Sequence, residues 1–140
     1  MSHKRTLIRN ELVSILQAAN TSAGSRIYGD RVLPLFDETY PLIMVYARDE
    51  SVSSQGSTPF PAKRTLPIFV EIRVTLNEGT SLDTSIDDIC DQVEAATKAN
   101  PRLNQKVIQM NLLSTEFDVL KDGEKILGGA RLTYETVYTD

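Results

Sequence analysis

The sequence predicts an α+β domain, in which an antiparallel or mixed four- to five-stranded sheet carries two helices on one face. The first observation is a strict alternation of aliphatic side chains over residues 64–76, the pattern of a strand with one buried face. The second is a pair of segments whose apolar residues recur every three or four positions, as in amphipathic helices. The third is the order helix, strands, helix, strands, which favours α+β over a regularly alternating fold.

The composition is that of one globular domain. With 140 residues, 41% hydrophobic and 24% charged, the chain can bury one core, and we expect a single domain over residues 1–140. The net charge of −4 argues against a protein whose main task is to grip nucleic acid through its phosphates. No apolar run reaches membrane-spanning length and no signal-peptide core follows the N-terminus, so we expect folding in a cytoplasm. The single cysteine, Cys90, fits a reducing compartment.

The first helix is predicted over Thr6–Ala19, with an end at Asn20 or Gly24. Its apolar stripe consists of Ile8, Leu12, Ile15, Leu16 and Ala19. Ser25–Asp30 predicts a brief strand, and Arg31–Pro41 predicts a surface loop.

The central strands come next. Leu42–Tyr46 is a continuous apolar run that predicts a buried strand, antiparallel to a long strand over Arg64–Leu76. Between them, Ala47–Lys63 is rich in serine, glycine and proline and is predicted to be a long connection without regular structure. Pro67 donates no hydrogen bond, so this part of the long strand should lie at a sheet edge or a bulge.

The long strand has two different faces. Leu66, Ile68, Val70, Ile72 and Val74 share the face predicted to pack against the helices. Phe69, Glu71 and Arg73 lie on the opposite, mixed face, which can meet water or another subunit.

A capping box of Thr80 with Asp83 predicts the start of the second helix, and Asn100–Pro101 its end. Its stripe consists of Leu82, Ile86, Ile89, Cys90, Val93, Ala96 and Thr97. Met110–Val119 and Ala130–Tyr138 predict the last two strands, joined through the Asp122–Gly123 turn. The pair Gly128–Gly129 predicts a bulge or bend before the final strand.

The side chains that carry chemistry do not form a catalytic, cofactor-binding or metal-binding pattern. His3, the only histidine, lies in a terminal segment expected to be frayed and exposed. Cys90 lies on an apolar helix stripe and is predicted to be a buried, inert thiol. Asp83, Asp87, Asp88 and Asp91 lack the loop and glycine of a calcium motif and are predicted to be a solvated helix face. We therefore expect no enzyme and no cofactor.

Several features in order along the chain resemble the phage minor tail protein U family, the tail terminators of long-tailed phages. They are R-I-Y-G-D-R (Arg26–Arg31), a proline before a strand ending in Val-Tyr (Pro41–Tyr46), R-x-L-x-x-x-V-E-I (Arg64–Ile72), S-L-D (Ser81–Asp83) and G-G-A-R-L-T-Y-E-T-V-Y (Gly128–Tyr138).

This resemblance implies a structural virion protein that caps the phage tail tube as a ring, expected to be a hexamer. The ring would end tube polymerisation and provide the surface for head–tail joining. Its partners would be further copies of itself, the tail tube protein and a head or neck protein, with no membrane and no specific nucleic-acid binding. The protein would be assembled in the bacterial cytoplasm and reside in the virion tail. The residues expected to contact partners are Arg48, Asp49, Glu50, Lys63, Arg64, Phe69, Glu71 and Arg73.

Two alternatives stay open at this point. One is a head–tail connector or neck (tail completion) protein of similar size. The other is a small α+β ligand-binding module or enzyme, which would need a pocket with convergent polar groups.

Overall fold

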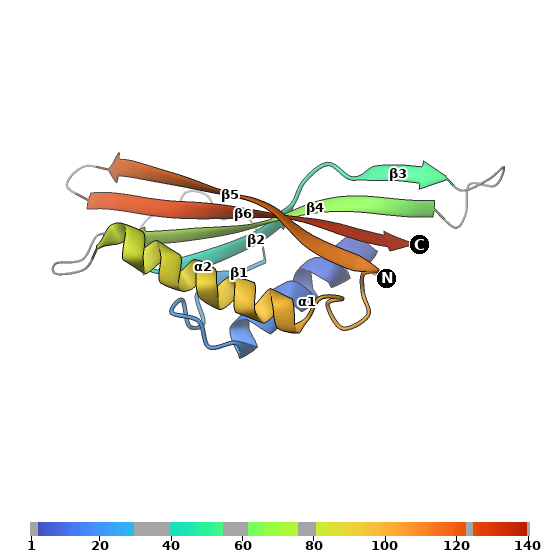
Figure 1. The fold of residues 1–140 in the computed structure, drawn as a ribbon, viewed down its shortest axis with the longest axis horizontal. Coiled ribbons are helices and arrows are strands. Elements are labelled where there is room, and N and C mark those ends of the chain that lie inside the picture. The colour runs from blue at the N-terminus through green and yellow to red at the C-terminus, as the bar shows by residue number, and fades with distance from the viewer. Residues whose placement is uncertain (1–2, 30–39, 55–61, 76–80, 123–124, 140) are drawn as a thin grey trace.

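A computed structural model describes residues 3–29, 40–54, 62–75, 81–122 and 125–139. The elements are α1 (Lys4–Ala18), β1 (Ile27–Tyr28), β2 (Leu42–Ala47), β3 (Ser51–Ser54), β4 (Ala62–Thr75), α2 (Leu82–Ala99), β5 (Gln109–Asp122) and β6 (Lys125–Thr139). Both helices lie on one face of a single sheet (Figure 1). The predicted α+β class is therefore confirmed.

Within the described residues the sheet has six strands, where the sequence predicted four or five. Its order is β1-β2-β4-β6-β5, and β3 pairs with β4 beyond the end of β2. Of the strand pairs formed by the described residues, β1–β2 is parallel and the others are antiparallel, so the sheet is mixed. The antiparallel pairing of β2 with β4, with Val45 opposite Val70, confirms the predicted central pair.

The core lies between the helices and one face of the sheet. Leu66, Ile68, Val70, Ile72 and Val74 of β4 are all at most 3% exposed and belong to one cluster with the helix side chains. The helices contribute the buried residues Ile8, Leu12, Leu16, Ile86, Ile89, Cys90 and Val93. This packing confirms the predicted inward face of the long strand. Full burial of each large aliphatic side chain contributes about 1.5–3 kcal/mol to the free energy of unfolding.

Side chains cap both helices, and one of the caps was not expected. His3 is exposed, as predicted, but it is the N-cap of α1: its Nδ1 accepts a hydrogen bond from the Arg5 backbone N–H at 3.0 Å. The N-cap of α2 is Ser81, whose Oγ accepts from the Thr84 N–H at 3.4 Å, and the predicted cap Thr80 lies outside the described residues. Asn100 ends α2 as predicted.

Part of the predicted loop Ala47–Lys63 is sheet. Ser51–Ser54 form β3, which pairs antiparallel with residues 62–65 along the same edge of β4 that β2 occupies. Polar residues pair here because the backbone supplies the ladder, so the low apolar content of the segment did not exclude a strand. The part of the prediction that concerns residues 55–61 lies outside the described residues.

Pro67 lies opposite a bulge, which confirms the prediction made from its missing N–H. Between the β2 and β3 ladders, the three residues 48–50 oppose only Leu66 and Pro67, so the register shifts by one residue. The Arg48 N–H donates to the Pro67 carbonyl at 3.2 Å. The backbone N and O of one strand residue point to the same side of the strand. The Pro67 nitrogen, which carries no hydrogen, therefore faces the bulge where the β2 and β3 ladders are interrupted.

The pair Gly128–Gly129 is not a bulge. Strand β6 runs through both residues in regular pairing from Lys125 onward, and the irregularity in this hairpin lies between Leu112 and Ser114 of β5. A Cβ at position 128 would lie 2.8 Å from Leu82 Cγ of α2, and one at position 129 would lie 2.6 Å from the Ile72 carbonyl oxygen. The glycines therefore permit close approach of a helix on one face and of the neighbouring strand on the other.

Val70→Asp tests the core. Val70 is fully buried, so the substitution places an unpaired carboxylate among aliphatic side chains, at a cost of several kcal/mol from a total of about 5–15 kcal/mol. We expect loss of soluble, folded protein, measured by soluble yield and circular dichroism. Ser53→Asp on exposed β3 is the control and should fold normally. A soluble Val70→Asp variant with an unchanged thermal midpoint would contradict this packing.

Candidate assembly surfaces

The eight predicted contact residues lie on two opposite sides of the sheet. Alternation along β4 directs Arg64 to the helix side, where it meets Glu50. Phe69, Glu71 and Arg73 point away from the helices, and the Arg48 guanidinium lies 5.8 Å from the Phe69 ring centroid. Asp49 and Lys63 are exposed. The structure therefore brings these residues together in two groups rather than one.

On the helix side, Glu50 is the centre of a buried polar cluster. Arg64 Nη1 lies 2.7 Å and Arg5 Nη1 3.1 Å from Glu50 Oε1, and the Tyr138 hydroxyl donates to Oε2. The Glu50 side chain is only 6% exposed. Beside this cluster, Lys4 Nζ donates to the Thr139 carbonyl at 2.6 Å. These contacts fasten the start of α1 to the ends of β4 and β6.

The surroundings of Glu50 favour its charged form. Burial by itself would raise the pKa of the carboxyl group, but the hydrogen bonds from Tyr138 and Arg64 and the charge of Arg5 outweigh it. The net result is a pKa below the ordinary value of 4.5. The same arrangement raises the pKa of Tyr138, through burial first and the adjacent carboxylate second.

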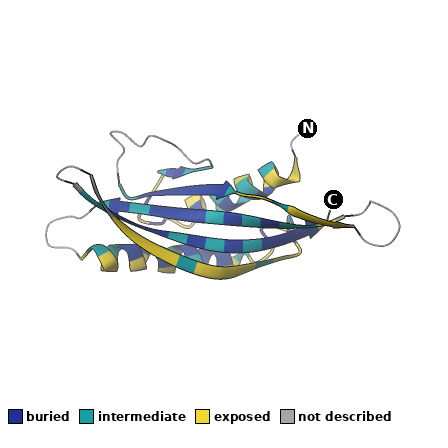
Figure 2. Ribbon diagram, turned by 90° about the horizontal axis from the view of Figure 1, so that it is seen from above, coloured by how far each residue is buried: buried dark blue, intermediate teal, exposed yellow. Residues whose placement is uncertain are grey.

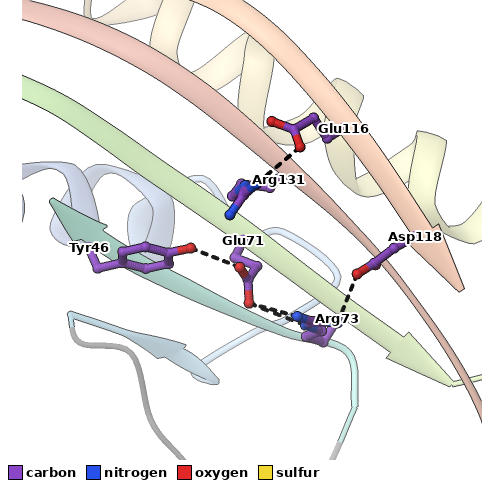
Figure 3. Close-up of polar contacts among 6 residues, drawn as sticks. All are labelled: Tyr46, Glu71, Arg73, Glu116, Asp118 and Arg131. Atoms are coloured by element: carbon purple, nitrogen blue, oxygen red, sulfur yellow. Dashed lines mark hydrogen bonds and ion pairs between the residues drawn. The ribbon is translucent and has the colours of Figure 1, made fainter. Parts of the chain in front are cut away.

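On the other side of the sheet, Glu71 is a buried carboxylate that is fully engaged within the chain (Figure 3). The Tyr46 hydroxyl donates to Oε1 at 2.8 Å. Arg73 donates to Oε2 through Nη2 at 3.0 Å and through Nε at 3.3 Å. Because both oxygens have partners and one partner is a cation, the charge is tolerated at 5% exposure.

The network continues to the edge strand β5. Arg73 Nη1 lies 3.7 Å from Asp118 Oδ2, and Arg131 Nη2 lies 3.0 Å from Glu116 Oε2 (Figure 3). Hydrogen bonding to Tyr46 and to Glu116 raises the pKa of the Arg131 guanidinium. A hollow of about 170 Å³ lies among these charges. Opposite charges are already paired around it, so the arrangement is suited to holding three strands together.

An aromatic stack lies beside this network. The Tyr46 and Phe69 rings are 5.3 Å apart and nearly parallel, and the Arg131 guanidinium lies 5.4 Å from the Phe69 centroid. Arg48 approaches the same ring, so Phe69 lies between two cations. Leu42 and Met44 are buried next to this stack. The second face of the sheet therefore has a small core of its own.

Among the described residues, β5 carries exposed charges and the most exposed large apolar side chains, none of which is among the eight predicted contact residues. The side chains of Glu116 and Asp118 are 60% and 54% exposed. Phe117 and Val119 are each 62% exposed, although they point to the helix side of the sheet. The alternation of this strand was visible in the sequence, but its place at the sheet edge was not. Figure 2 shows it as the exposed strand along one long edge.

Among the described residues, possible metal ligands do not cluster and the cysteine is buried. Within ranges 3–29, 40–54, 62–75, 81–122 and 125–139, no group of three or more His, Cys, Asp or Glu side chains could hold a metal ion. In the same ranges, neither helix combines the length and apolar character needed to cross a bilayer. Cys90 is buried, and burial followed by nearby carboxylates raises its pKa to about 11. It is therefore a poor nucleophile.

Arg73→Met tests the ion pair on the outer face. The substitution removes the cation beside the buried Glu71 and leaves the hydrogen bond from Tyr46, and we expect a loss of about 1–3 kcal/mol in the free energy of unfolding. Adding Glu71→Gln should restore part of that loss. Glu116→Gln is the control, because this side chain is 60% exposed and such surface pairs contribute about 0–1 kcal/mol. Equal losses for both single variants in urea denaturation would contradict the role of Glu71.

Glu50→Gln tests the cluster at the start of α1. A carboxyl group with a lowered pKa in the folded state stabilises the fold above its unfolded pKa, and this stabilisation is lost as pH falls through the folded pKa. We expect the variant to be less stable at neutral pH by on the order of 1 kcal/mol, with a difference that shrinks below pH 4.5. Free energies of unfolding across this range measure it, with exposed Glu116→Gln as the control. A difference that is constant with pH would contradict the lowered pKa.

Comparison with known proteins gives a match at the level of structure. No protein-family model and no curated protein matches the sequence. The fold is similar to that of a chain in a solved structure described as "Virion of native gene transfer agent (GTA) particle", with a TM-score of 0.50 and 12% identity. The match covers 96% of this chain and 94% of that chain. At this identity, the two chains share a fold over nearly their whole lengths.

Proposed function

We propose that this protein is a structural component of a phage-like virion, the tail terminator that caps the tail tube as a ring. The observation that carries the proposal is the fold shared, over nearly the full length of both chains, with a chain of a gene transfer agent virion particle. The sequence pattern that resembles tail terminators supports the finer assignment, since it extends from Arg26 to Tyr138.

The architecture is compatible with a ring subunit. A ring with cyclic symmetry needs two different surfaces on each subunit, because each copy contacts the next head to tail. The sheet ends in the long strand β5 on one side and in the short strands β1 and β3 on the other. Each copy thus has two unlike edges that could meet in neighbouring copies.

The predicted contact residues divide into two roles under this proposal. Arg48, Asp49 and Lys63 are exposed and can touch a partner directly. Glu50, Arg64, Glu71 and Arg73 hold the strands in place through the two networks, and Phe69 supports Arg48. They would shape a contact surface rather than form most of it.

Capping of tail tubes tests the proposal. Purified protein is added to growing tubes polymerised from tail tube protein without their natural terminator, and tube lengths are measured by electron microscopy. We expect density at tube ends and arrested growth. Tubes that already carry their natural terminator are the control and should bind no further protein.

The results of this experiment distinguish a tail terminator from a neck or tail completion protein. Continued growth with no protein at tube ends contradicts a terminator. Binding to purified head connectors with no binding to tubes would instead identify a neck or tail completion protein, which the same fold match accommodates.

A further inference from the structure

The outer edge of β5 is an open sheet edge with an apolar border. Among the described residues, β5 pairs only with β6, so one side of its 14-residue backbone has no strand partner. Leu112, Phe117 and Val119 form an apolar strip on its helix-side face, with exposures of 38%, 62% and 62%. Their register partners Tyr134, Ala130 and Gly128 place them on that face. Long apolar edge strands are normally covered or blocked, because they pair with other chains.

The apolar strip lies beside α2 and not beneath it. Helix α2 packs on β4 and β6, and Leu82 and Ile86 come close to Gly128. A groove of about 280 Å³ lies between the C-terminal part of α2 and the start of β5, with Tyr134, Met110 and Leu112 among its lining residues. Apolar surface therefore continues from the strip into a groove.

Strand directions make a second copy of this chain a suitable occupant. β4 runs antiparallel to β3 and to β6, and β6 runs antiparallel to β5. β5 therefore runs in the direction opposite to β3. A second copy placed with the same orientation would bring its β3 antiparallel to β5, with the helices of both copies on the same side of one continuous sheet.

The side chains at the two edges are complementary on both faces in this placement. On the helix side, Val52 of β3 is 53% exposed. Within one chain Val52 is level with Tyr138 and the start of β5, so the second copy must also be displaced along the strands, by about seven residues or roughly 23 Å, for Val52 to meet the apolar strip. On the other side, β5 exposes Glu116 and Asp118. Near the β3 edge two bases are exposed, Arg48 before β3 and Lys63 of β4, which pairs with Ser53, and one acid, Asp49, lies beside them. A symmetric β5–β5 contact would instead place the acids of β5 against one another, which is unfavourable.

We propose that the β5 edge binds the β3 edge of a second copy of this chain in a head-to-tail contact. This inference rests on the proposed ring and gives it a subunit contact. The backbone groups of β3 extend the hydrogen-bond ladder of β5, and the apolar strip supplies buried area. The charges on the outer face favour a β5–β3 contact over a β5–β5 contact.

Mixed cross-linking tests the direction of the contact. Ser114→Cys on β5 and Ser53→Cys on β3 are made as separate proteins, both at exposed positions. Native Cys90 stays in place, because a buried thiol with a pKa of about 11 reacts poorly with a cross-linker. A thiol cross-linker spanning several ångströms should join the two variants when they are mixed. It should join neither variant to itself, and neither to Ser14→Cys on the exposed face of α1.

Removal of the apolar strip tests its contribution. Phe117→Ser with Val119→Ser should lower the mixed cross-linking yield about tenfold or more, with an unchanged circular dichroism spectrum. Leu7→Ser, a 43% exposed apolar residue of α1, is the matched control and should leave the yield unchanged.

Each outcome bears on the proposal separately from the function. Absence of mixed cross-links, cross-linking of Ser114→Cys to itself alone, or an unaffected yield in the double serine variant would each overturn the β5–β3 contact. If the double serine variant still caps tubes, the β5–β3 contact is not the ring contact, and the proposed function is not contradicted. Mixed cross-links from a protein that does not cap tubes would support the contact and contradict the function.

Discussion

Burial of the aliphatic face of β4 is the constraint on which the rest of the structure depends. Five inward side chains of this strand require cover, and the two helices provide it. A helix with its side chains is about 10 Å wide and strands are about 4.8 Å apart, so two helices cover roughly four strands. Helix α1 lies against β1 and β2, and α2 lies against β4 and β6. The fifth strand of the path, β5, extends past this cover, which explains why its apolar side chains are exposed.

No helix covers the second face of the sheet in the described structure, and its side chains cover or pair with one another instead. Close to β2, the Tyr46–Phe69 stack and the buried Leu42 and Met44 form a small apolar core. Further across, Glu71, Arg73, Glu116, Asp118 and Arg131 link β4, β6 and β5 through ion pairs. Because the interior charges are paired within the chain, the face keeps a defined shape while its outer charges remain exposed.

The residues at the bulge between β2 and β3 connect these two sides. Arg48 reaches Phe69 on the outer face, while Glu50, two residues later, reaches Arg64 and Tyr138 on the helix side. Opposite the bulge, Pro67 lacks the donor that a continuous ladder would use. Pro67 thus lies opposite a bulge in the neighbouring chain segment, and this bulge directs Arg48 and Glu50 to opposite faces of the sheet.

Local patterning was sufficient to predict the fold class, the long central strand and its inward face, and both helix stripes, because alternation and three-to-four spacing depend only on neighbouring residues. It also located Glu71 and Arg73 on the outer face. Tertiary structure alone decided that Glu50 meets Arg5 and Tyr138, that the polar segment Ser51–Ser54 pairs as a strand, and that Gly128–Gly129 permits close packing instead of a bulge. The place of β5 at the sheet edge was likewise undecided, because strand order depends on which elements cover which strands, and no local pattern records it.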